Sequence, residues 1–333
     1  MKKSRFRHDK PTLSHYKFTG LATRSTLVVK LIAMHTLEIK NLCKTYRNGV
    51  KALDHVSLSI SNGMFGLLGP NGAGKSSLMR TLATLQQPDS GQILFSGMDV
   101  LKQSQQLRTQ LGYLPQDFGV YPKIAAVDLL DHLAILKGVL NKNERKEQVA
   151  ALLQQTNLYT DRKRAVSSFS GGMRQRFGIA QALLGSPKLI IVDEPTAGLD
   201  PTERNRFHDL LSEIGENVIV LLSTHIVEDV HDLCPDMAVM AGGKVILQGK
   251  PAELTQKLAG MIWRKTIPKQ ELAHYKESMD IISSRLIGGK MQVHAHSPVS
   301  PGEGFEAIHP TLEDVYFAAL AGTSSMQKGG VLC

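Results

Sequence analysis

The chain has 333 residues, 42% of them hydrophobic and 21% charged, which is ordinary for a folded protein and enough for two modest domains. The net charge of +9 would suit a nucleic-acid partner, but residues 1–33 carry eight basic residues against Asp9, a net of +7 that leaves only +2 for the rest. Three scattered cysteines exclude a disulfide framework, and no apolar run reaches the roughly 18 residues of a membrane-spanning helix. A function at a membrane would therefore need another subunit to span it.

Residues 1–33 form a basic N-terminal extension without a clear period. A targeting presequence has this basic, acid-poor composition. A disordered tail, or a translation start upstream of the functional one at Met34, is the interpretation we favour, because strand-like alternation begins cleanly there. Lys30 interrupts the only apolar run, which argues against a secretory signal.

Short strands are predicted next. Residues 37–39 and 56–60 alternate between apolar and polar side chains, and Asn48-Gly49 and Asn62-Gly63 are dipeptides typical of hairpins. We expect an antiparallel β segment here. A helical stretch over residues 98–112 follows.

The middle of the chain has helical spacing. Leucines recur at helical intervals from Leu129 to Leu140, and residues 145–158 continue in the same manner. We therefore expect a helical subdomain over about residues 117–180.

Continuous apolar runs at residues 189–192 and 218–222 flank a helical pattern at 203–214 and predict buried parallel strands of an α/β core. Gly242-Gly243 predicts a hairpin between residues 237–241 and 244–247. The domain built around this core is expected to cover residues 34–250.

A small α+β accessory domain is predicted over residues 251–323, with helices at 269–279 and 311–320, and a flexible tail over 324–333. His294 and His296 share one strand face. Without a third ligand in view we interpret them as surface residues, not a metal site.

Residues 69–77, Gly-Pro-Asn-Gly-Ala-Gly-Lys-Ser-Ser, match the phosphate-binding pattern G-x-x-x-x-G-K-[ST] between an apolar strand at 64–68 and a helical pattern at 76–82. Glycines let backbone N–H groups converge on phosphates, and the helix N-terminus adds partial positive charge. Lys75 is placed for the β- and γ-phosphates and Ser76 for Mg²⁺.

The second nucleotide element is the buried strand that ends in Asp193 and Glu194. Ligands of open α/β sheets bind at the carboxyl ends of the strands. Asp193 is therefore expected to hold Mg²⁺, and Glu194 to polarise the attacking water as general base.

Residues 169–173, Phe-Ser-Gly-Gly-Met, precede a basic helix start, Arg174-Gln175-Arg176. With the two elements above, this signature loop resembles the L-S-G-G-Q signature of the ATP-binding subunits of ABC transporters. Phe169 and Met173 depart from the usual first and last letters, while the serine and glycines that reach phosphate are intact. The resemblance implies a head-to-tail dimer in which this loop contacts the partner's ATP.

Smaller elements of the same family follow in order. The resemblance implies that Tyr46 stacks on adenine, that Gln116 senses Mg²⁺ and water, and that His225 contacts the γ-phosphate. Residues 197–200, Ala-Gly-Leu-Asp, match the loop that crosses the dimer interface.

The C-terminal segment 310–316, Pro-Thr-Leu-Glu-Asp-Val-Tyr, resembles the end of the subunits that serve ABC-2-type exporters, including multidrug and sodium-efflux systems. The same residues also suit a helix N-terminus with Thr311 as N-cap, and both interpretations can hold together.

The sequence thus predicts an α/β P-loop ATPase core with an antiparallel β subdomain, a helical subdomain and a small C-terminal α+β module. The resemblance implies an ATPase that powers export through a separate transmembrane permease, as a homodimer or with a paired ATPase subunit, on the cytoplasmic face of the inner membrane. The expected cofactors are ATP and Mg²⁺, with Ser76, Gln116 and Asp193 at the metal and Glu194, His225, Lys75 and Gln116 in catalysis. Residues expected to bind the nucleotide are Tyr46, Gly69, Pro70, Asn71, Gly72, Ala73, Gly74, Lys75, Ser76, Ser77, Gln116, Ser170, Gly171, Gly172, Met173, Asp193 and His225.

Two other functions were weighed. A soluble ABC ATPase acting on ribosomes or DNA is disfavoured, because this chain has one phosphate loop, no sustained heptads and a nearly neutral body. A regulatory ATP-binding module without turnover is disfavoured because Glu194 and His225 are both present. No nucleic-acid partner is expected, and the transported substrate is not encoded here.

Overall fold

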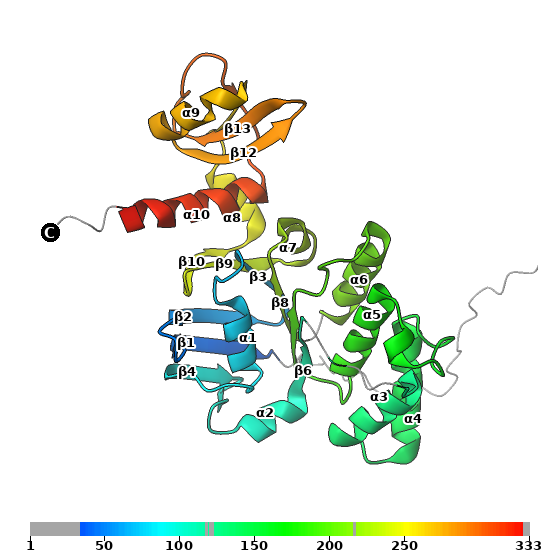
Figure 1. Cartoon of the computed structure of the whole chain (residues 1–333). Coiled ribbons are helices and arrows are strands. Elements are labelled where there is room, and N and C mark those ends of the chain that lie inside the picture. The colour runs from blue at the N-terminus through cyan, green and yellow to red at the C-terminus, as the bar shows by residue number, and fades with distance from the viewer. Residues whose placement is uncertain (1–33, 117–118, 120–122, 216–217, 329–333) are drawn as a thin grey trace, which may run out of the picture. The chain divides into compact units, whose positions relative to one another are not determined.

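The computed structural model describes residues 34–116, 119, 123–215 and 218–328, with side chains described as far as residue 322 (Figure 1). The predictions for residues 1–33 and for the end of the C-terminal tail lie outside these residues. Among the residues described, no helix combines the length and the apolar character needed to cross a membrane.

A six-stranded sheet with the order β10-β9-β3-β8-β7-β6 forms the centre of the fold. Adjacent strands from β9 to β6 run parallel, and β10 pairs antiparallel with β9 as the predicted hairpin. Every residue of β7 and β8 is buried, which explains their continuous apolar runs. The strands are β3 (Gly63–Leu68), β6 (Leu111–Leu114), β7 (Leu189–Asp193), β8 (Ile219–Thr224), β9 (Asp236–Ala241) and β10 (Lys244–Gly249).

The predicted antiparallel segment is confirmed as a second sheet, with the order β2-β1-β4-β5. The turn at Asn48-Gly49 joins β1 to β2, and the Gly49 N–H donates to Tyr46 O at 2.9 Å. The hairpin predicted at Asn62-Gly63 is wrong: β2 pairs with β1, whereas β3 pairs with β8 and β9, so this dipeptide carries the chain from one sheet to the other. The strands are β1 (Thr36–Thr45), β2 (Lys51–Ser61), β4 (Ser90–Phe95) and β5 (Met98–Asp99).

Strands β4, β5 and β6 had no clear signal in the sequence. The sequence of β6, Leu-Gly-Tyr-Leu, contains Gly112 because a Cβ there would lie 2.2 Å from the Ala182 carbonyl oxygen of a covering helix. A glycine in so short a strand hides its periodicity. The helical stretch expected over residues 98–112 is reduced to residues 104–110 between two strands.

Helices cover both faces of the central sheet (Figure 1). One hydrophobic cluster joins α1 to the inner faces of the two sheets, and a second joins α5, α6 and α7 to the opposite face of the central sheet. Gly66 in β3 admits α7, since a Cβ there would lie 2.8 Å from Val230. The helices are α1 (Lys75–Leu82), α2 (Ser104–Gln110), α3 (Ala126–Leu136), α4 (Lys142–Gln155), α5 (Gly171–Ala182), α6 (Pro201–Ile214), α7 (Val227–Leu233), α8 (Pro251–Lys257), α9 (Leu272–Ser278) and α10 (Leu312–Lys328), with 3-10 turns at Val166–Ser168 and Lys269–Glu271.

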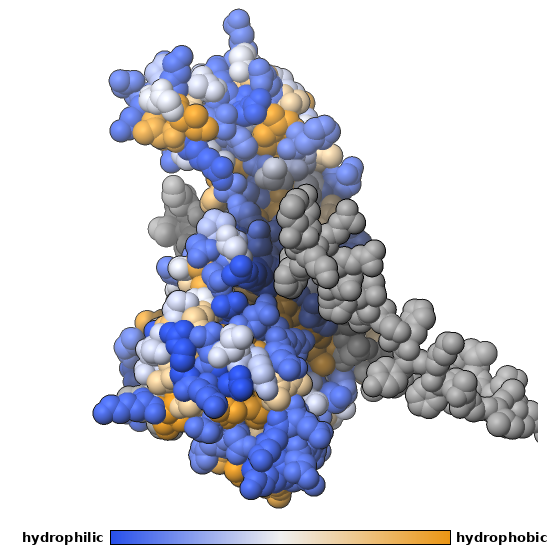
Figure 2. All heavy atoms as spheres, turned by 90° about the vertical axis from the view of Figure 1, so that its right-hand side faces the viewer, coloured by the Kyte–Doolittle hydropathy of each residue, from blue (hydrophilic) through white to orange (hydrophobic). Residues whose placement is uncertain are grey.

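The predicted helical subdomain corresponds to the region of α3, α4 and α5. This region has its own hydrophobic cluster, which includes Leu130, Leu153 and Phe177. The predicted leucine pattern extends beyond the helix. Helix α3 ends at Leu136, and Leu140 is 74% exposed. On the side shown in Figure 2, hydrophilic residues predominate and the apolar areas between them are small.

The C-terminal region contains a third sheet, β12-β13-β11-β14, with α9 packed on one face around Ile267 and Val293. Its strands are β11 (Ile262–Ile267), β12 (Ile281–Ile287), β13 (Lys290–His296) and β14 (Glu306–Ala307). The interpretation of His294 as a surface residue is wrong. Its ring is half-buried, and Nδ1 lies 2.7 Å from Oδ1 of the buried Asp314.

Helix α10 begins as predicted. Thr311 Oγ1 accepts a hydrogen bond from the Asp314 N–H at 3.3 Å, and Asp314 Oδ2 accepts from the Thr311 N–H at 2.8 Å, which is a reciprocal cap. The flexible tail predicted from residue 324 begins inside this helix, which continues to Lys328. Leu312 and Tyr316 join the cluster on the central sheet, so α10 contacts both the core and the C-terminal sheet (Figure 1).

Candidate nucleotide site

The phosphate loop, residues 69–77, connects β3 to α1 and depends on glycine at three points. Gly72 and Gly74 have φ angles of 80° and 103°, in the left-handed region that glycine adopts without strain. A Cβ at Gly69 would lie 2.4 Å from the Met240 carbonyl oxygen, and one at Gly74 would lie 2.3 Å from the Ala52 carbonyl oxygen. The loop therefore needs glycine at these three positions, because a side chain would clash with neighbouring backbone or strain its own.

Lys75 is 4% exposed, and its ammonium lies at the mouth of this loop. Nζ donates to the Gly69 carbonyl oxygen at 2.7 Å and to the Pro70 carbonyl oxygen at 3.3 Å. Lys75 Nζ also forms an ion pair with Glu194 Oε1 at 3.4 Å. An ammonium held by neutral carbonyls and one carboxylate is placed to turn toward an incoming phosphate.

Glu194 is the point at which the predicted catalytic residues meet. Its carboxylate Oε2 accepts from Gln116 Nε2 at 3.4 Å and lies 3.2 Å from His225 Nδ1, while Oε1 faces Lys75. These four side chains come from α1 and from the ends of β6, β7 and β8, which lie side by side in the sheet.

The backbone of Glu194 is strained. Its φ of 49° is unusual for a residue with a side chain. The Glu194 N–H donates to the Ser223 carbonyl oxygen at 2.8 Å, which holds the turn in place. Strain of this kind is commonly found where function fixes a side chain's direction.

Asp193 is 3% exposed, and burial raises the pKa of its carboxyl above the ordinary value. The hydroxyls of Ser223 and Ser76 oppose this effect, the charge of Glu194 adds to it, and Lys75 opposes it. Among the described residues, Asp193 Oδ1 is buried without a hydrogen-bond partner. A partnerless buried carboxylate oxygen near a hydroxyl fits a hard cation with oxygen ligands, such as Mg²⁺.

A cavity of about 600 Å³ opens over the phosphate loop, and most predicted binding residues line it. The Tyr46 ring is 38% exposed, and its hydroxyl contacts Ser77 Oγ at 3.0 Å and Gln86 Oε1 at 3.1 Å. Asp193 and His225 adjoin this cavity through Glu194 without lining it. The lining residues are Tyr46, Val50, Lys51, Ala52, residues 71–77, Gln116, Glu194 and Gly242.

Sequence reasoning missed Val50, Lys51, Ala52 and Gly242 as lining residues. The sequence pattern predicts only a turn at Gly242 and Gly243. The Gly243 N–H donates to the Ala73 carbonyl oxygen at 3.0 Å, so the β9–β10 hairpin braces the phosphate loop. For Val50, Lys51 and Ala52 the sequence did offer a signal. Lys51 lies near Tyr46 in the first hairpin, and Tyr46 is already expected to bind the nucleotide.

The signature loop, residues 169–173, does not join this cavity. Ser170 caps α5 by accepting from the Met173 N–H at 3.2 Å, and Ser170 and Gly171 are exposed. Gly172 is buried, and a Cβ there would lie 2.4 Å from the Glu203 carboxylate. Within one chain, then, the two predicted phosphate-binding loops are separate.

The interface segment, residues 197–200, leads into α6. Asp200 is exposed and caps that helix by accepting from the Glu203 N–H at 2.9 Å. Like the signature loop, this segment is not among the residues that line the cavity.

A parallel sheet with a phosphate loop and two carboxylates at its strand ends defines a P-loop ATPase. The ABC transporter family model matches residues 53–197. The chain is 34% identical over 284 residues to the probable multidrug ABC transporter ATP-binding protein YbhF of Escherichia coli (strain K12), and the match covers 80% of this chain and 49% of YbhF. The chain thus spans about half the length of that relative.

A second relative is the ABC transporter ATP-binding protein NatA of Bacillus subtilis (strain 168), 37% identical over 203 residues, with 60% of this chain and 82% of NatA covered. The structure resembles the dimeric post-hydrolysis state of the ATP-binding cassette MJ0796 bound to ADP and Pi, with a TM-score of 0.59, 25% identity, and 64% of this chain and 98% of that chain covered. The chain belongs to the ABC transporter family and contains the ATPase domain of that family.

Proposed function

We propose that this subunit powers export through a separate membrane-spanning permease, working as a dimer on the cytoplasmic face of the inner membrane. The observation that carries its catalytic part is the convergence of Lys75, Gln116 and His225 on the Glu194 carboxylate. The export direction is supported by the C-terminal segment 310–316, which resembles the end of the subunits that serve ABC-2-type exporters.

In the proposed reaction, Glu194 takes a proton from a water that attacks the γ-phosphorus of ATP in line, while the bond to the bridging oxygen breaks and ADP leaves, giving ADP and inorganic phosphate. Lys75 and the phosphate-loop amides stabilise the charge that develops on the phosphate oxygens. Gln116 and His225 hold the carboxylate and the water in register. Tyr46 stacks on the adenine, for which its partly exposed ring leaves room.

Mg²⁺, when bound, would neutralise part of the charge of the phosphates. The chain's own contribution is Ser76, Gln116 and Asp193, all oxygen donors. Asp193 Oδ1 is the best placed, because it is buried and has no partner among the described residues. Magnesium binding is a proposal that rests on this donor set.

The dimer is proposed to be head-to-tail, with the signature loop of one chain on the ATP of the other. Support comes from the exposure of Ser170 and Gly171 and from the dimeric structure of MJ0796. A paired, non-identical ATPase subunit would use the same contacts. The useful output would be closure and reopening of this dimer, passed to the permease through the helical region around α3, α4 and α5.

The division of labour in the chain is also a proposal: an ATPase domain over residues 34–250, its helical subdomain near 117–180, and an accessory module over 251–323. The separate clusters of the helical region and the C-terminal sheet support it. Helix α10 nevertheless packs its Leu312 and Tyr316 against the core.

The transport proposal is tested by tagged pull-down from detergent-solubilised membranes and from cytosol, with partners identified by mass spectrometry. We expect a polytopic membrane protein in stoichiometric yield. Ribosomal proteins or DNA, with nothing from the membrane, would overturn the proposal in favour of a soluble ABC ATPase.

The catalytic roles are tested by Glu194→Gln. Loss of the general base should slow steady-state ATP hydrolysis by about 10²–10⁴-fold while ATP binding is kept. Glu213→Gln, an exposed acid on α6, is the matched control and should hydrolyse ATP normally. Unchanged hydrolysis by Glu194→Gln would show that another group activates the water.

A further inference from the structure

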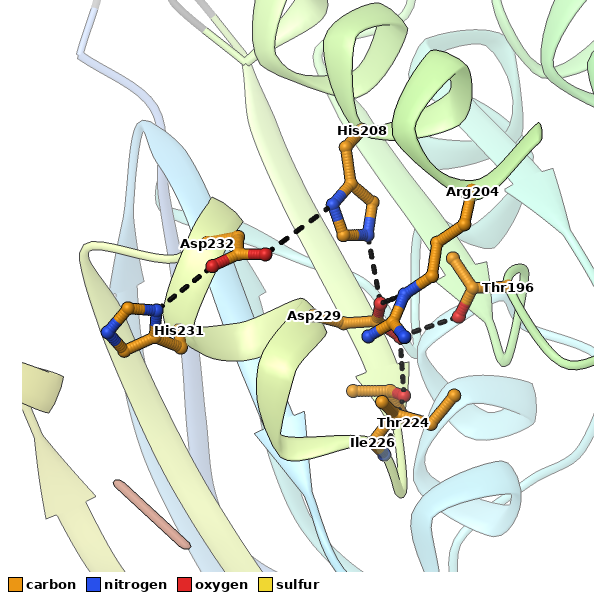
Figure 3. A network of polar contacts seen from close by, with 8 residues as sticks. All are labelled: Thr196, Arg204, His208, Thr224, Ile226, Asp229, His231 and Asp232. Atoms are coloured by element: carbon orange, nitrogen blue, oxygen red, sulfur yellow. Dashed lines mark hydrogen bonds and ion pairs between the residues drawn. The ribbon is translucent and has the colours of Figure 1, made fainter. Parts of the chain in front are cut away.

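The carboxylate of Asp229, on α7, is fully buried and accepts hydrogen bonds from four side chains (Figure 3). Oδ2 accepts from Thr196 Oγ1 at 2.5 Å and from Thr224 Oγ1 at 3.1 Å. Oδ1 accepts from Arg204 Nε at 2.8 Å and lies 2.9 Å from His208 Nε2. Burying a carboxylate is costly without such partners, so these contacts offset its loss of hydration.

Two of these partners flank the proposed catalytic pair. Thr196 lies two residues after Glu194, and Thr224 lies immediately before His225. The Thr224 hydroxyl also accepts from the Ile226 N–H at 3.0 Å, which fixes the turn that carries the histidine. One oxygen of Asp229 therefore joins the two loops that bear the general base and its histidine.

The other oxygen, Oδ1, contacts two residues of the helix that follows the segment 197–200. Arg204 and His208 both belong to α6, whose N-cap is Asp200. Asp200 closes the segment 197–200 that runs between Thr196 and this helix. The Asp229 carboxylate thus holds the segment 197–200 at both ends. It bonds directly to Thr196, which precedes the segment, and it bonds to α6, which follows it.

We propose that Asp229 is a positioning residue for ATP hydrolysis. Its carboxylate holds the loop after β7 against the loop after β8, so that Glu194 and His225 stay 3.2 Å apart while the segment 197–200 stays aligned with them. The inference rests on the catalytic roles proposed above for Glu194 and His225. Asp229 itself lines no part of the nucleotide cavity.

A residue that only stabilises the fold would behave differently. Its loss would lower the melting temperature without altering turnover per folded molecule. A positioning residue changes kcat and leaves nucleotide binding intact, because the phosphate loop and Tyr46 are untouched.

The first test is Asp229→Asn, which keeps the shape and removes the charge. We expect kcat for ATP to fall by about 10-fold or more, with KM and ATP binding unchanged within about 2-fold. Asp232→Asn is the matched control. Asp232 lies on the same helix, is 55% exposed, and faces His208 only at 4.0 Å, so its loss should leave kcat unchanged. Wild-type kcat in Asp229→Asn, or a lower melting temperature with unchanged kcat, would overturn the proposal.

A second pair of variants decides the question if Asp229→Asn does not fold. Thr196→Val keeps nearly the same side-chain shape but removes one hydrogen bond. Thr196→Ser keeps the hydroxyl. We expect the valine variant to lose kcat and the serine variant to recover it. Equal kcat in the two variants would contradict a role for this hydrogen bond and overturn the proposal.

Glu194→Gln, measured in parallel, separates the two levels of inference. If it hydrolyses ATP normally, the catalytic assignment itself is wrong. If it is inactive while Asp229→Asn and Thr196→Val turn over normally, the catalytic assignment stands and only the positioning role of Asp229 falls.

Discussion

The chain carries two glycine-rich loops, each leading into a helix, and their surroundings are opposite. The phosphate loop, residues 69–77, is walled by Tyr46, Gln116 and Glu194 of the same chain, and its Lys75 is buried. The signature loop, residues 169–173, presents Ser170 and Gly171 to solvent, and neither residue lines the cavity over the phosphate loop.

This difference teaches which half of the site one chain can supply. Both loops offer backbone amides at a helix N-terminus, the geometry that binds phosphate. Only the first adds a cation, a carboxylate and an aromatic ring around the same space. The second has its serine hydroxyl turned to its own helix cap, and in the proposed dimer the ATP of the partner chain would complete its site.

The largest expected effects come from breaking one loop at a time. Lys75→Ala removes the ammonium, so ATP binding and hydrolysis should both fall, hydrolysis by at least about 100-fold. Ser170→Arg places bulk on the exposed loop, so hydrolysis should fall similarly while the separate chain still binds ATP. Steady-state ATPase assays and nucleotide titration measure the two properties.

Mixing the two variants sharpens the comparison. A head-to-tail heterodimer has one intact site, made from the phosphate loop of Ser170→Arg and the signature loop of Lys75→Ala. Random mixing should restore about a quarter of the wild-type rate, because half of the dimers are mixed and each has one working site. Lys102→Ala, at a side chain 82% exposed, controls for loss of charge. A mixture as inactive as its components would argue against sites shared between chains.

The two adjacent glycines of the signature loop allow a finer separation. At Gly172 a Cβ meets the Glu203 side chain at 2.4 Å, so Gly172→Ala should destabilise the chain by about 1–3 kcal/mol. At Gly171 nothing lies within 4 Å, so Gly171→Ala should leave the melting temperature unchanged or slightly raised while lowering hydrolysis in the dimer. Equal melting temperatures for the two variants would contradict the described packing.

Within the phosphate-loop half, acidification should weaken metal binding. The pKa of Asp193 is raised mainly by burial, and a protonated carboxyl cannot ligate Mg²⁺. Apparent Mg²⁺ affinity should therefore fall as the pH drops through this raised pKa, as measured by Mn²⁺ or Mg²⁺ titration of the ATP-bound protein. Asp193→Asn should bind the metal weakly and lose this pH dependence.

The stability of the metal-free protein should depend on pH in the opposite sense. Because folding raises the pKa of Asp193, its contribution favours the folded state at low pH and is lost as the pH rises through the folded value. A metal affinity that is constant over this range would show that Asp193 is not a ligand.

The smallest effect on either loop is expected from the C-terminal region. Burial tends to raise the pKa of Asp314, but His294 and the cap at Thr311 outweigh it and hold the pKa below its ordinary value. Its stabilisation is therefore present above the ordinary carboxyl pKa and is lost as the pH falls through the lower folded value. Asp314→Asn should cost about 1 kcal/mol in unfolding by denaturant, with unchanged ATPase activity. Reduced kcat in this variant would connect α10 to the nucleotide site.

The sequence by itself determined the local features of this protein. The phosphate loop, the strand ending in Asp193 and Glu194, the hairpin at Gly242-Gly243 and the cap at Thr311 all depend on residues a few positions apart. Turn chemistry and apolar periodicity act over that range, so a pattern in the sequence is enough to predict them.

The predictions that failed or were missing depend on contacts between residues far apart in the sequence. Asn62-Gly63 has the composition of a hairpin, but the sheets on either side of it differ. Gly112 hides a strand because a distant helix approaches it, and His294 is half-buried because Asp314 comes from another element. In each case the partner lies too far along the chain for a local pattern to register it.

Tertiary structure alone decided how the proposed catalytic groups meet. Lys75, Gln116 and His225 reach Glu194 because the order β3-β8-β7-β6 brings their strand ends together, and the left-handed turn at Glu194 aims its carboxylate at all three. Asp229 collects its four donors for the same reason. Strand order in a parallel sheet is set by crossover connections and burial over the whole domain, which no short stretch of sequence encodes.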